Sequence, residues 1–278
     1  MIRKVLFAEK SVPTIEGAGV RLNRVFGNGN EEVTDPFLLL DHFKSMNSDD
    51  YIAGFPWHPH RGIETVTYMI SGKVSHEDNL GNKGVINAGD VQWMTAGSGI
   101  IHQEMPIKTK EENHGFQLWV NLPKKNKMMK PRYRGIEAKD IPLVKISEGV
   151  EAKVISGEVK SIKGPVKDLI VPIEYFDVSV KKGKDFSCKT IKDNSVFLYV
   201  HQGKVMVNGS EHGEKTLLIF DDGEEVKVEG VTDSKFIFVS GKKLREPIAW
   251  YGPIVMNTEE EIKTAFEEYR NGTFIKKD

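Results

Sequence analysis

The chain has 278 residues, a length that allows two domains or one large all-β unit. Its 39 Lys and Arg residues nearly balance its 40 Asp and Glu residues, so overall charge gives no field that would attract DNA or RNA, and we expect no direct nucleic-acid partner. The single cysteine, Cys188, excludes an internal disulfide framework and any zinc or iron–sulfur cage built from several cysteines.

Apolar runs along the chain are short. The stretch Val5–Ala8 is cut off by Glu9 and Lys10, so we expect no signal peptide. The run Phe37–Leu40 lies between two aspartates and falls far short of the roughly 20 apolar residues that cross a bilayer. The sequence therefore predicts a cytoplasmic protein without a membrane partner.

Short segments rich in β-branched and aromatic residues recur between Gly, Asn and Asp turns, a rhythm that predicts an all-β fold. The clearest expected strands are, in chain order, Glu64–Ile70, Val91–Met94, Phe116–Asn121, Glu174–Val180, Val196–Val200, Lys204–Val207 and Phe236–Val239. Between the first three and the rest, the basic, Pro-bounded stretch Lys124–Pro131 indicates a linker or surface loop. Asn208-Gly209 predicts a two-residue hairpin turn, because both residues tolerate positive φ.

One helix is expected, near the C-terminus. Thr258 and Glu261 have the spacing of a capping box, apolar residues follow at helical intervals, and Asn271-Gly272 predicts the end. We expect this helix to pack against a barrel or a neighbouring lobe.

A weak internal repeat predicts two similar lobes. Tyr68, Gly72, Lys73 and Val74 match four identical residues, Tyr199, Gly203, Lys204 and Val205, at a constant offset. We place the boundary between Pro123 and Ile141, with domains at 1–130 and 131–278. The same offset carries His58 and His60 onto Lys189 and Ile191, so the second lobe cannot repeat whatever these histidines do.

The main chemical signal is His58-Pro59-His60. Residues two apart on an extended backbone point to the same face, so both imidazoles can converge on one point. Pro59 restricts its own backbone and that of His58 to extended conformations, which lowers the cost of ordering the pair.

A second pair, His102-Gln103-Glu104, repeats this spacing with an imidazole and a carboxylate. Together the pairs predict one divalent metal ion held by His58, His60, His102 and Glu104. By spacing alone Glu64 is the alternative carboxylate. Three nitrogens and one oxygen suit Fe²⁺, Mn, Ni, Cu or Zn without selecting one, and leave positions open for water, substrate or dioxygen.

The remaining histidines and the nearby aromatic residues have ordinary interpretations. Single histidines in strands are usually hydrogen-bonded or exposed, and we interpret His42, His76, His114, His201 and His212 in this way. Phe55, Trp57, Trp93 and Met94 lie near the expected ligands and could form an apolar wall for a flat aromatic substrate, although packing in the core is the more common role of such residues.

Long motifs resemble the pirin family of the cupin superfamily. Residues 58–68 resemble the pirin form of the first cupin motif, and residues 89–106 resemble the second. Asp35–Asp41 and Glu246–Pro253 also look like pirin signatures. The resemblance thus spans nearly the whole chain.

This resemblance implies a bicupin, with two antiparallel jelly-roll-like β-barrels packed face to face and a metal only in the N-terminal one. It implies that Glu104, from the second motif, is the carboxylate ligand, and it leaves Glu64 another role. The metal of the family is commonly Fe²⁺, with other divalent ions also found.

The resemblance also implies a function, namely a metal-dependent dioxygenase similar to pirin-type quercetin 2,3-dioxygenases. These enzymes open the flavonol ring with O₂ and release CO, and Glu104 would be both ligand and catalytic base. The main alternative is a non-enzymatic, iron-binding regulatory or redox-sensing protein, and a third possibility is a cupin isomerase or an enzyme acting on a small organic acid.

Overall fold

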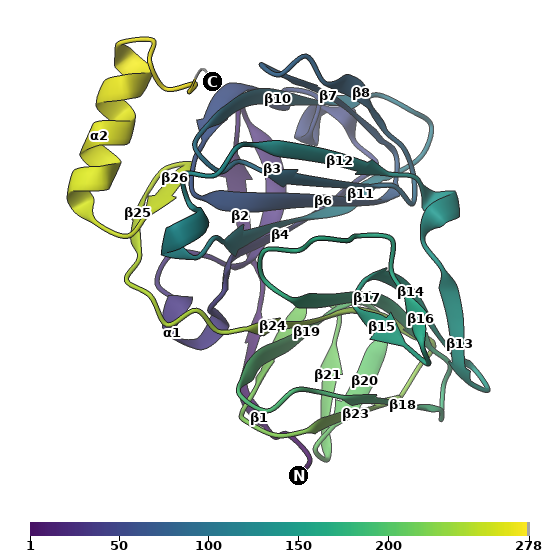
Figure 1. The fold of residues 1–278 in the computed structure, drawn as a ribbon. Coiled ribbons are helices and arrows are strands. Elements are labelled where there is room, and N and C mark those ends of the chain that lie inside the picture. The colour runs from purple at the N-terminus through teal and green to yellow at the C-terminus, as the bar shows by residue number, and fades with distance from the viewer. Residues whose placement is uncertain (277–278) are drawn as a thin grey trace. The chain divides into compact units, whose positions relative to one another are not determined.

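The computed structural model describes residues 1–276 and consists mainly of antiparallel strands, which confirms the expected all-β class. The strands form two compact units (Figure 1). The N-terminal barrel unit contains Pro13–Asn28, Phe37–Ala138 and the described residues from Leu244 on. The C-terminal barrel unit contains Met1–Val12, Gly29–Pro36 and Lys139–Lys243.

The N-terminal barrel unit has two antiparallel sheets. The larger has the order β12-β9-β6-β11-β4-β3-β2 and is made of β2 (Val12–Glu16), β3 (Val20–Phe26), β4 (Phe37–Ser45), β6 (Ile63–Ser71), β9 (Val91–Thr95), β11 (Asn113–Asn121) and β12 (Arg132–Ile136). The smaller has the order β5-β10-β7-β8 and is made of β5 (Phe55–His60), β7 (Lys73–Asp78), β8 (Lys83–Ile86) and β10 (Ile100–Ile107).

The C-terminal barrel unit also has two antiparallel sheets. The larger has the order β1-β22-β19-β24-β17-β14-β13 and is made of β1 (Val5–Lys10), β13 (Leu143–Ser147), β14 (Val150–Ser156), β17 (Ile173–Val180), β19 (Asn194–Gln202), β22 (Thr216–Phe220) and β24 (Ser234–Lys242). The smaller has the order β18-β23-β20-β21 and is made of β18 (Asp185–Lys189), β20 (Lys204–Val207), β21 (Ser210–Gly213) and β23 (Glu225–Gly230).

Four further hairpin strands and several short helical turns complete the chain: β15 (Glu158–Val159), β16 (Ile162–Lys163), β25 (Ala249–Tyr251), β26 (Ile254–Met256), α1 (Glu31–Thr34), η1 (Ser48–Asp50), η2 (Lys124–Asn126) and η3 (Ala138–Asp140).

The two units have the same sheet plan, and this supports the repeat found in the sequence. β6 and β19 occupy the same position in their larger sheets, and β7 and β20 the same position in the smaller ones. Gly72 and Gly203, which connect these strands, both have positive φ, at 79° and 76°. The strands equivalent to β5 and β10 are β18 and β23, and neither carries a histidine.

The expected strands all lie within or coincide with observed ones, because alternating or continuous apolar residues bury a face of each sheet. For example, Glu64–Ile70 lies inside β6, and Lys204–Val207 is β20. Asn208 and Gly209 have positive φ, as the predicted hairpin turn requires.

The domain boundaries differ from the two continuous halves expected. β1 pairs with β22 in the C-terminal barrel unit, although its residues belong to the predicted first domain. β12 pairs with β9 in the N-terminal barrel unit, although it follows residue 130. The hydrophobic rhythm locates strands but does not specify partners, so it could not reveal this exchange.

The expected helix is α2 (Glu259–Arg270), with the capping box of Thr258 and Glu261 formed and Asn271 at its C-terminus. The predicted domain boundaries assign this helix to the second domain, but it belongs to the N-terminal barrel unit. There it packs with β25 and β26 through Ile254, Ile262 and Phe274 (Figure 1). We call β25, β26, α2 and the residues through Phe274 the C-terminal arm.

The stretch Lys124–Pro131 is only partly a surface loop. Lys127 is almost completely buried, and its Nζ donates hydrogen bonds to Gly62 O (2.9 Å), Asn121 Oδ1 (2.6 Å) and Val255 O (3.0 Å). Burial lowers the Lys127 pKa to about 7. This residue therefore links the loop to the C-terminal arm.

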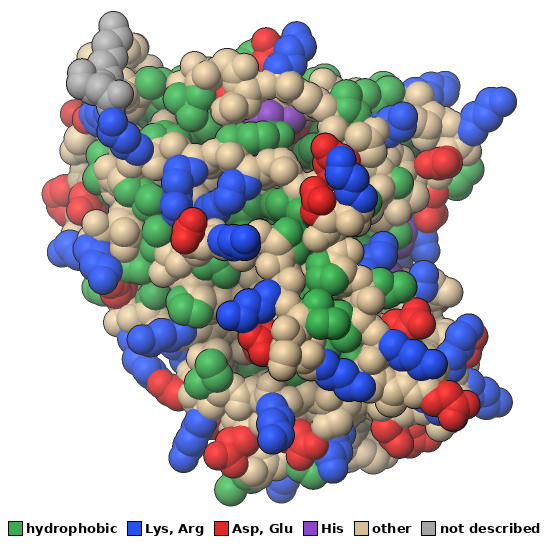
Figure 2. Space-filling view, turned by 45° about the vertical axis from the view of Figure 1, so that its right-hand side comes forward, with side chains coloured by type: hydrophobic (Ala, Val, Ile, Leu, Met, Phe, Trp, Pro, Cys, Tyr) green, Lys and Arg blue, Asp and Glu red, His purple; other side chains and the backbone are tan. Residues whose placement is uncertain are grey.

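Charges of both signs alternate over the face in Figure 2, as the balanced composition predicts. Within residues 1–276, none of the helices has the length and apolar character required to cross a membrane.

Candidate metal centre

The two sequence pairs that predict a metal site lie on neighbouring strands. β5 carries His58 and His60, β10 carries His102 and Glu104, and the strands are antiparallel with His102 directly opposite His58. A register shift follows His102, so that Glu104 pairs with Phe55. The pleat therefore directs His58, His60 and His102 toward one point, as their spacing predicts.

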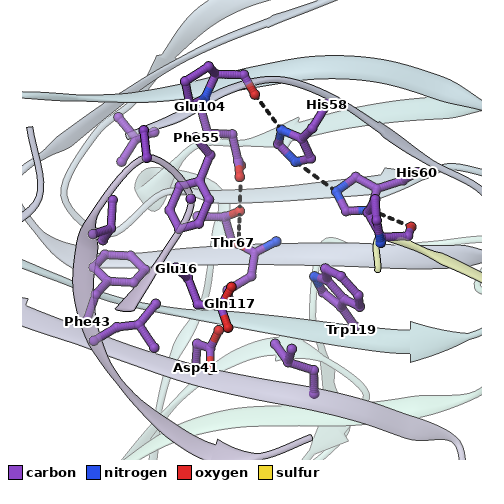
Figure 3. A pocket seen from close by; sticks show the side chains of 18 of the residues that line it. Glu16, Asp41, Phe43, Phe55, His58, His60, Thr67, Glu104, Gln117 and Trp119 are labelled. Carbon is purple, nitrogen blue, oxygen red and sulfur yellow. Dashed lines mark hydrogen bonds between the residues drawn. The ribbon is translucent and has the colours of Figure 1, made fainter. Parts of the chain in front are cut away.

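The Nε2 atoms of the three histidines face one another. The Nε2 of His58 lies 3.0 Å from that of His60 and 3.0 Å from that of His102 (Figure 3 shows His58 and His60). The Nδ1 atoms of His58 and His60 lie 2.8 and 3.1 Å from the carbonyl oxygens of Pro56 and Pro253. A carbonyl only accepts hydrogen bonds, so these Nδ1 atoms carry the protons and both Nε2 atoms present lone pairs.

Two such lone pairs cannot hydrogen-bond each other, and a shared cation resolves their repulsion. Nitrogen ligands about 2.1 Å from an ion and about 90° apart lie about 3.0 Å from each other. The histidine geometry fits this arrangement, and backbone carbonyls are common partners for the second nitrogen of a metal-bound imidazole. The Nδ1 of His102 is buried and has no hydrogen-bond partner among residues 1–276.

The electrostatics of the cluster also favour the ligand form of each histidine. Burial, and next the neighbouring imidazoles, lower the pKa of His60 and His102 well below its ordinary value. Burial also lowers the pKa of His58, against a smaller opposing effect of the Pro56 carbonyl. All three are therefore neutral near pH 7, as metal binding requires.

Glu104 lies beside this cluster, on the same strand as His102. Its Oε1 accepts a hydrogen bond from Thr67 Oγ1 at 3.0 Å (Figure 3). It forms a second group with His102 and His76, whose ligand atoms lie within 4.8 Å of one another. Burial raises the Glu104 pKa to about 7, against the Thr67 hydrogen bond. The three histidines thus converge, whereas ligation by Glu104 remains a prediction.

His76 belongs to this group, although we interpreted it from sequence as an ordinary histidine. It is completely buried on β7 as the pairing partner of Glu104, and its ring stacks on Tyr133 with centroids 4.9 Å apart. Its Nε2 lies 3.3 Å from Asp78. No spacing in the sequence shows that β7 pairs with β10, so only the fold could identify His76.

The alternative carboxylate, Glu64, is occupied elsewhere. It is completely buried, accepts a hydrogen bond from Thr95 Oγ1, and lies 3.3 Å from Arg134 Nη2. It belongs to none of the metal-capable groups found in the described chain. Its contacts agree with the expectation that it has another role.

A cavity of about 680 Å³ opens beside the histidines, within the N-terminal barrel unit. Phe55 and Trp57 line it, as the wall prediction requires, but Trp93 and Met94 are completely buried outside it. Trp93 pairs with Val66, whereas the adjacent Thr67 lines the cavity, so Trp93 points to the opposite face of the sheet.

Two aromatic residues of the wall were missed from sequence. Trp119 lies edge-on to His60 with ring centroids 5.1 Å apart, and Trp250 lies 5.9 Å from Trp119 (Trp119 is shown in Figure 3). Trp250 comes from the C-terminal arm, more than a hundred residues away in sequence. The cavity beside the candidate metal site is therefore flanked by aromatic rings.

Comparison with known proteins agrees with this architecture. The family profile described as Pirin matches residues 19–120, and that described as Pirin C-terminal cupin domain matches residues 175–275. The two matched segments fall on the two predicted lobes.

Individual relatives match over nearly the whole chain. A pirin-like protein of Caulobacter vibrioides is 43% identical over 274 residues, covering 98% of this chain and 99% of the relative. Pirin of Homo sapiens is 40% identical over 276 residues, covering 97% and 93%. A crystal structure of quercetin 2,3-dioxygenase from Acinetobacter baumannii is 36% identical, with a TM-score of 0.91 and 99% of both chains covered. With its two cupin barrels, the chain belongs to the pirin family.

Proposed function

We propose that this protein is a metal-dependent dioxygenase that opens the flavonol ring of quercetin-like substrates with O₂ and releases CO. The observation that carries the proposal is the convergence of three imidazole Nε2 atoms at the edge of an aromatic-walled cavity. The similarity to quercetin 2,3-dioxygenase of Acinetobacter baumannii supports the choice of reaction.

In this proposal His58, His60 and His102 hold the metal through Nε2, and Glu104 provides the fourth ligand. The ion is one divalent transition metal, with Fe²⁺ the first choice and Mn, Ni, Cu or Zn compatible with the same donors. When bound, it supplies a Lewis acid for the substrate oxygen and a centre for reaction with O₂.

The protein residues position the flavonol and remove a proton from it. Glu104 lines the cavity beside the histidines, and its carboxylate accepts the proton of the 3-hydroxyl. The Thr67 hydroxyl fixes one Glu104 oxygen by its hydrogen bond. Phe55, Trp57 and Trp119 flank the rings and exclude water from the reacting end.

The proposal is tested with protein reconstituted anaerobically with Fe²⁺ and then mixed with quercetin in air. We expect O₂ uptake and CO release in equal amounts, with His102→Ala protein as the inactive control. Protein with a full equivalent of metal that consumes no O₂ and releases no CO would overturn the dioxygenase assignment and favour a metal-holding binding protein.

A further inference from the structure

A row of polar side chains crosses the floor of the cavity on five adjacent strands. Thr67 on β6 pairs with Gln117 on β11, Gln117 pairs with Asp41 on β4, and Asp41 pairs with Arg24 on β3. Glu16, at the end of β2, completes the row. All five residues line the cavity, and we call them the polar row.

Side-chain contacts join the polar row into two groups, Thr67 with Gln117 and Arg24 with Asp41 and Glu16. Thr67 Oγ1 lies 2.6 Å from Gln117 Oε1 and 3.0 Å from Glu104 Oε1. Arg24 binds Asp41 with two hydrogen bonds, of 2.7 and 2.9 Å, and its Nη2 also lies 2.9 Å from Glu16. In Figure 3, Asp41 lies on the far side of Thr67 and Gln117 from Glu104.

The neighbours of the polar row on the same sheet face are apolar. Leu39 and Phe43 flank Asp41 on β4, and Leu22 precedes Arg24 on β3, all lining the same cavity. Asp41 is 5% exposed, and burying such a group costs free energy that an ion pair often only offsets. Replacing a buried ion pair by apolar residues is often neutral or stabilising, so stability alone does not explain these charges.

The charge of the distal end of the row decides which ligands it accepts. One guanidinium faces two carboxylates, which leaves this end with a net charge of −1. Arg24 already uses N–H donors on Asp41 and Glu16. The carboxylate oxygens of Asp41 and Glu16 and the amide oxygen of Gln117 each have a second lone pair that can accept a hydrogen bond from a ligand. A ligand group that donates hydrogen bonds is therefore favoured there, and an anionic group is repelled.

We propose that the polar row determines substrate specificity, selecting neutral aromatic molecules with phenolic hydroxyls at the end remote from the metal and rejecting aromatic acids. The inference depends on the proposed function, since it assumes that the reacting end of the ligand lies at the histidines. Asp41, Arg24, Glu16 and Gln117 are then specificity-determining residues rather than catalytic ones.

The test is a binding measurement on the full-length protein loaded with Zn²⁺ under argon, in which turnover does not occur. The ligands are 3-hydroxyflavone, quercetin and a 3-hydroxyflavone with a carboxylate in place of the distal hydroxyls. Quenching of tryptophan fluorescence reports binding, because Trp57, Trp119 and Trp250 line the cavity. We expect quercetin to bind about tenfold more tightly than 3-hydroxyflavone, and the acid more weakly than both.

The variants Glu16→Gln and Asp41→Asn test whether the preference for quercetin over 3-hydroxyflavone comes from the polar row. Each removes one negative charge, so we expect the quercetin preference to fall to about threefold or less and the acid to bind more tightly, with 3-hydroxyflavone unchanged. Glu16 is partly exposed, so its variant should fold even if Asp41→Asn does not. Glu77→Gln, on β7 outside the cavity, is the matched control and should retain the wild-type preference.

The outcomes separate this inference from the proposed function. Equal affinity for 3-hydroxyflavone and quercetin, or an unchanged ratio in Glu16→Gln, would overturn the role of the polar row and leave the dioxygenase proposal standing. No binding of any flavonol to the metal-loaded protein would overturn both. A purely structural role would lower the thermal midpoint of Asp41→Asn without changing the affinity ratio of Glu16→Gln.

Discussion

The protons on His58 and His60 are fixed by carbonyl groups that the chain places behind each ring. Pro56 and Pro253 accept from the two Nδ1 atoms, and the Nε2 atoms are left to face one another. Without a cation these lone pairs repel each other, which raises the free energy of the metal-free cluster. Metal binding removes this repulsion. Each imidazole should therefore contribute strongly to metal affinity.

We expect His58→Ala and His102→Ala to lower metal affinity by at least about a hundredfold, more than loss of a residue behind a ligand usually costs. Isothermal titration with Mn²⁺ or Zn²⁺, with elemental analysis of the purified variants, measures the change. His201→Ala is the control, because His201 lies in the C-terminal barrel unit and should leave affinity unchanged. Equal losses in all three variants would contradict the assigned site.

Glu104 should make the stability of the metal-free protein depend on pH. Burial raises its pKa from 4.5 to about 7, so the folded protein favours the protonated carboxyl. The stabilising contribution is full below about pH 4.5 and is lost as pH rises through 7. Compared with Glu104→Gln, which has no such proton, the wild type should lose on the order of 3 kcal/mol between pH 5 and pH 8.

Urea unfolding of both proteins in chelator at pH 5 and pH 8 measures this difference. Both proteins contain the same histidines, so the contribution of histidine titration to the free energy of unfolding cancels in the comparison. Added metal should reduce the difference at pH 8, because a cation favours the ionised carboxylate. Parallel pH dependence of wild type and Glu104→Gln would show that Glu104 is not protonated in the folded protein.

The candidate ligands could be predicted from sequence because they occur in pairs two residues apart, and alternate residues of a strand point to the same face. His76 and Trp250 could not, since each approaches the site through pairing or packing between distant segments. The same limit explains why the sequence could not exclude Trp93 from the cavity wall, since the direction of its side chain depends on which residue of β6 it pairs with.

Among the elements, the C-terminal arm is joined to the candidate metal site through Arg61, the residue after His60. The Arg61 side chain donates to Ser98 O (2.7 Å) and Phe274 O (2.9 Å), forms an ion pair with Glu268 at 2.7 Å, and lies over the Phe274 ring. The arm also supplies the carbonyl that orients His60. The packing of the arm should therefore affect the geometry of the candidate metal site.

Phe274→Ala tests this connection. Phe274 is 1% exposed, so its loss should cost about 3–5 kcal/mol of stability. It should also weaken metal binding by about tenfold, because the arm positions His60. Phe186→Ala, a similar deletion in the core of the C-terminal barrel unit, is the matched control and should lower stability without weakening metal binding. Melting curves and metal titrations on both variants separate the two effects.

Most elements were predictable because their signals are local. Alternation and turn residues locate β6, β20 and the Asn208 turn, and a capping box locates α2. The burial of Lys127 could not be predicted from sequence. Its ammonium group is stabilised by three acceptors, and these come from segments that only the fold brings together. A local sequence pattern does not show which distant segment a strand or side chain packs against.

In the molecule as a whole, two copies of one sheet plan have diverged in chemistry. The strands equivalent to β5 and β10 carry no histidine, in agreement with the sequence offset. The chain also exchanges its ends: β1 completes a sheet of the C-terminal barrel unit, whereas the C-terminal arm belongs to the N-terminal barrel unit. This exchange makes each half of the sequence depend on the other.

Fragments 1–130 and 131–278 should therefore fold only when both are present. The first lacks β12 and the C-terminal arm, which exposes the edge of β9 and removes the carbonyl behind His60. The second lacks β1, which exposes the edge of β22, and unpaired edges promote aggregation. We expect each fragment alone to be insoluble or unfolded, and the co-expressed pair to co-purify with one equivalent of metal. A soluble fragment 1–130 that unfolds cooperatively and binds metal would show that the exchanged segments are dispensable, because the first barrel would then be complete without them.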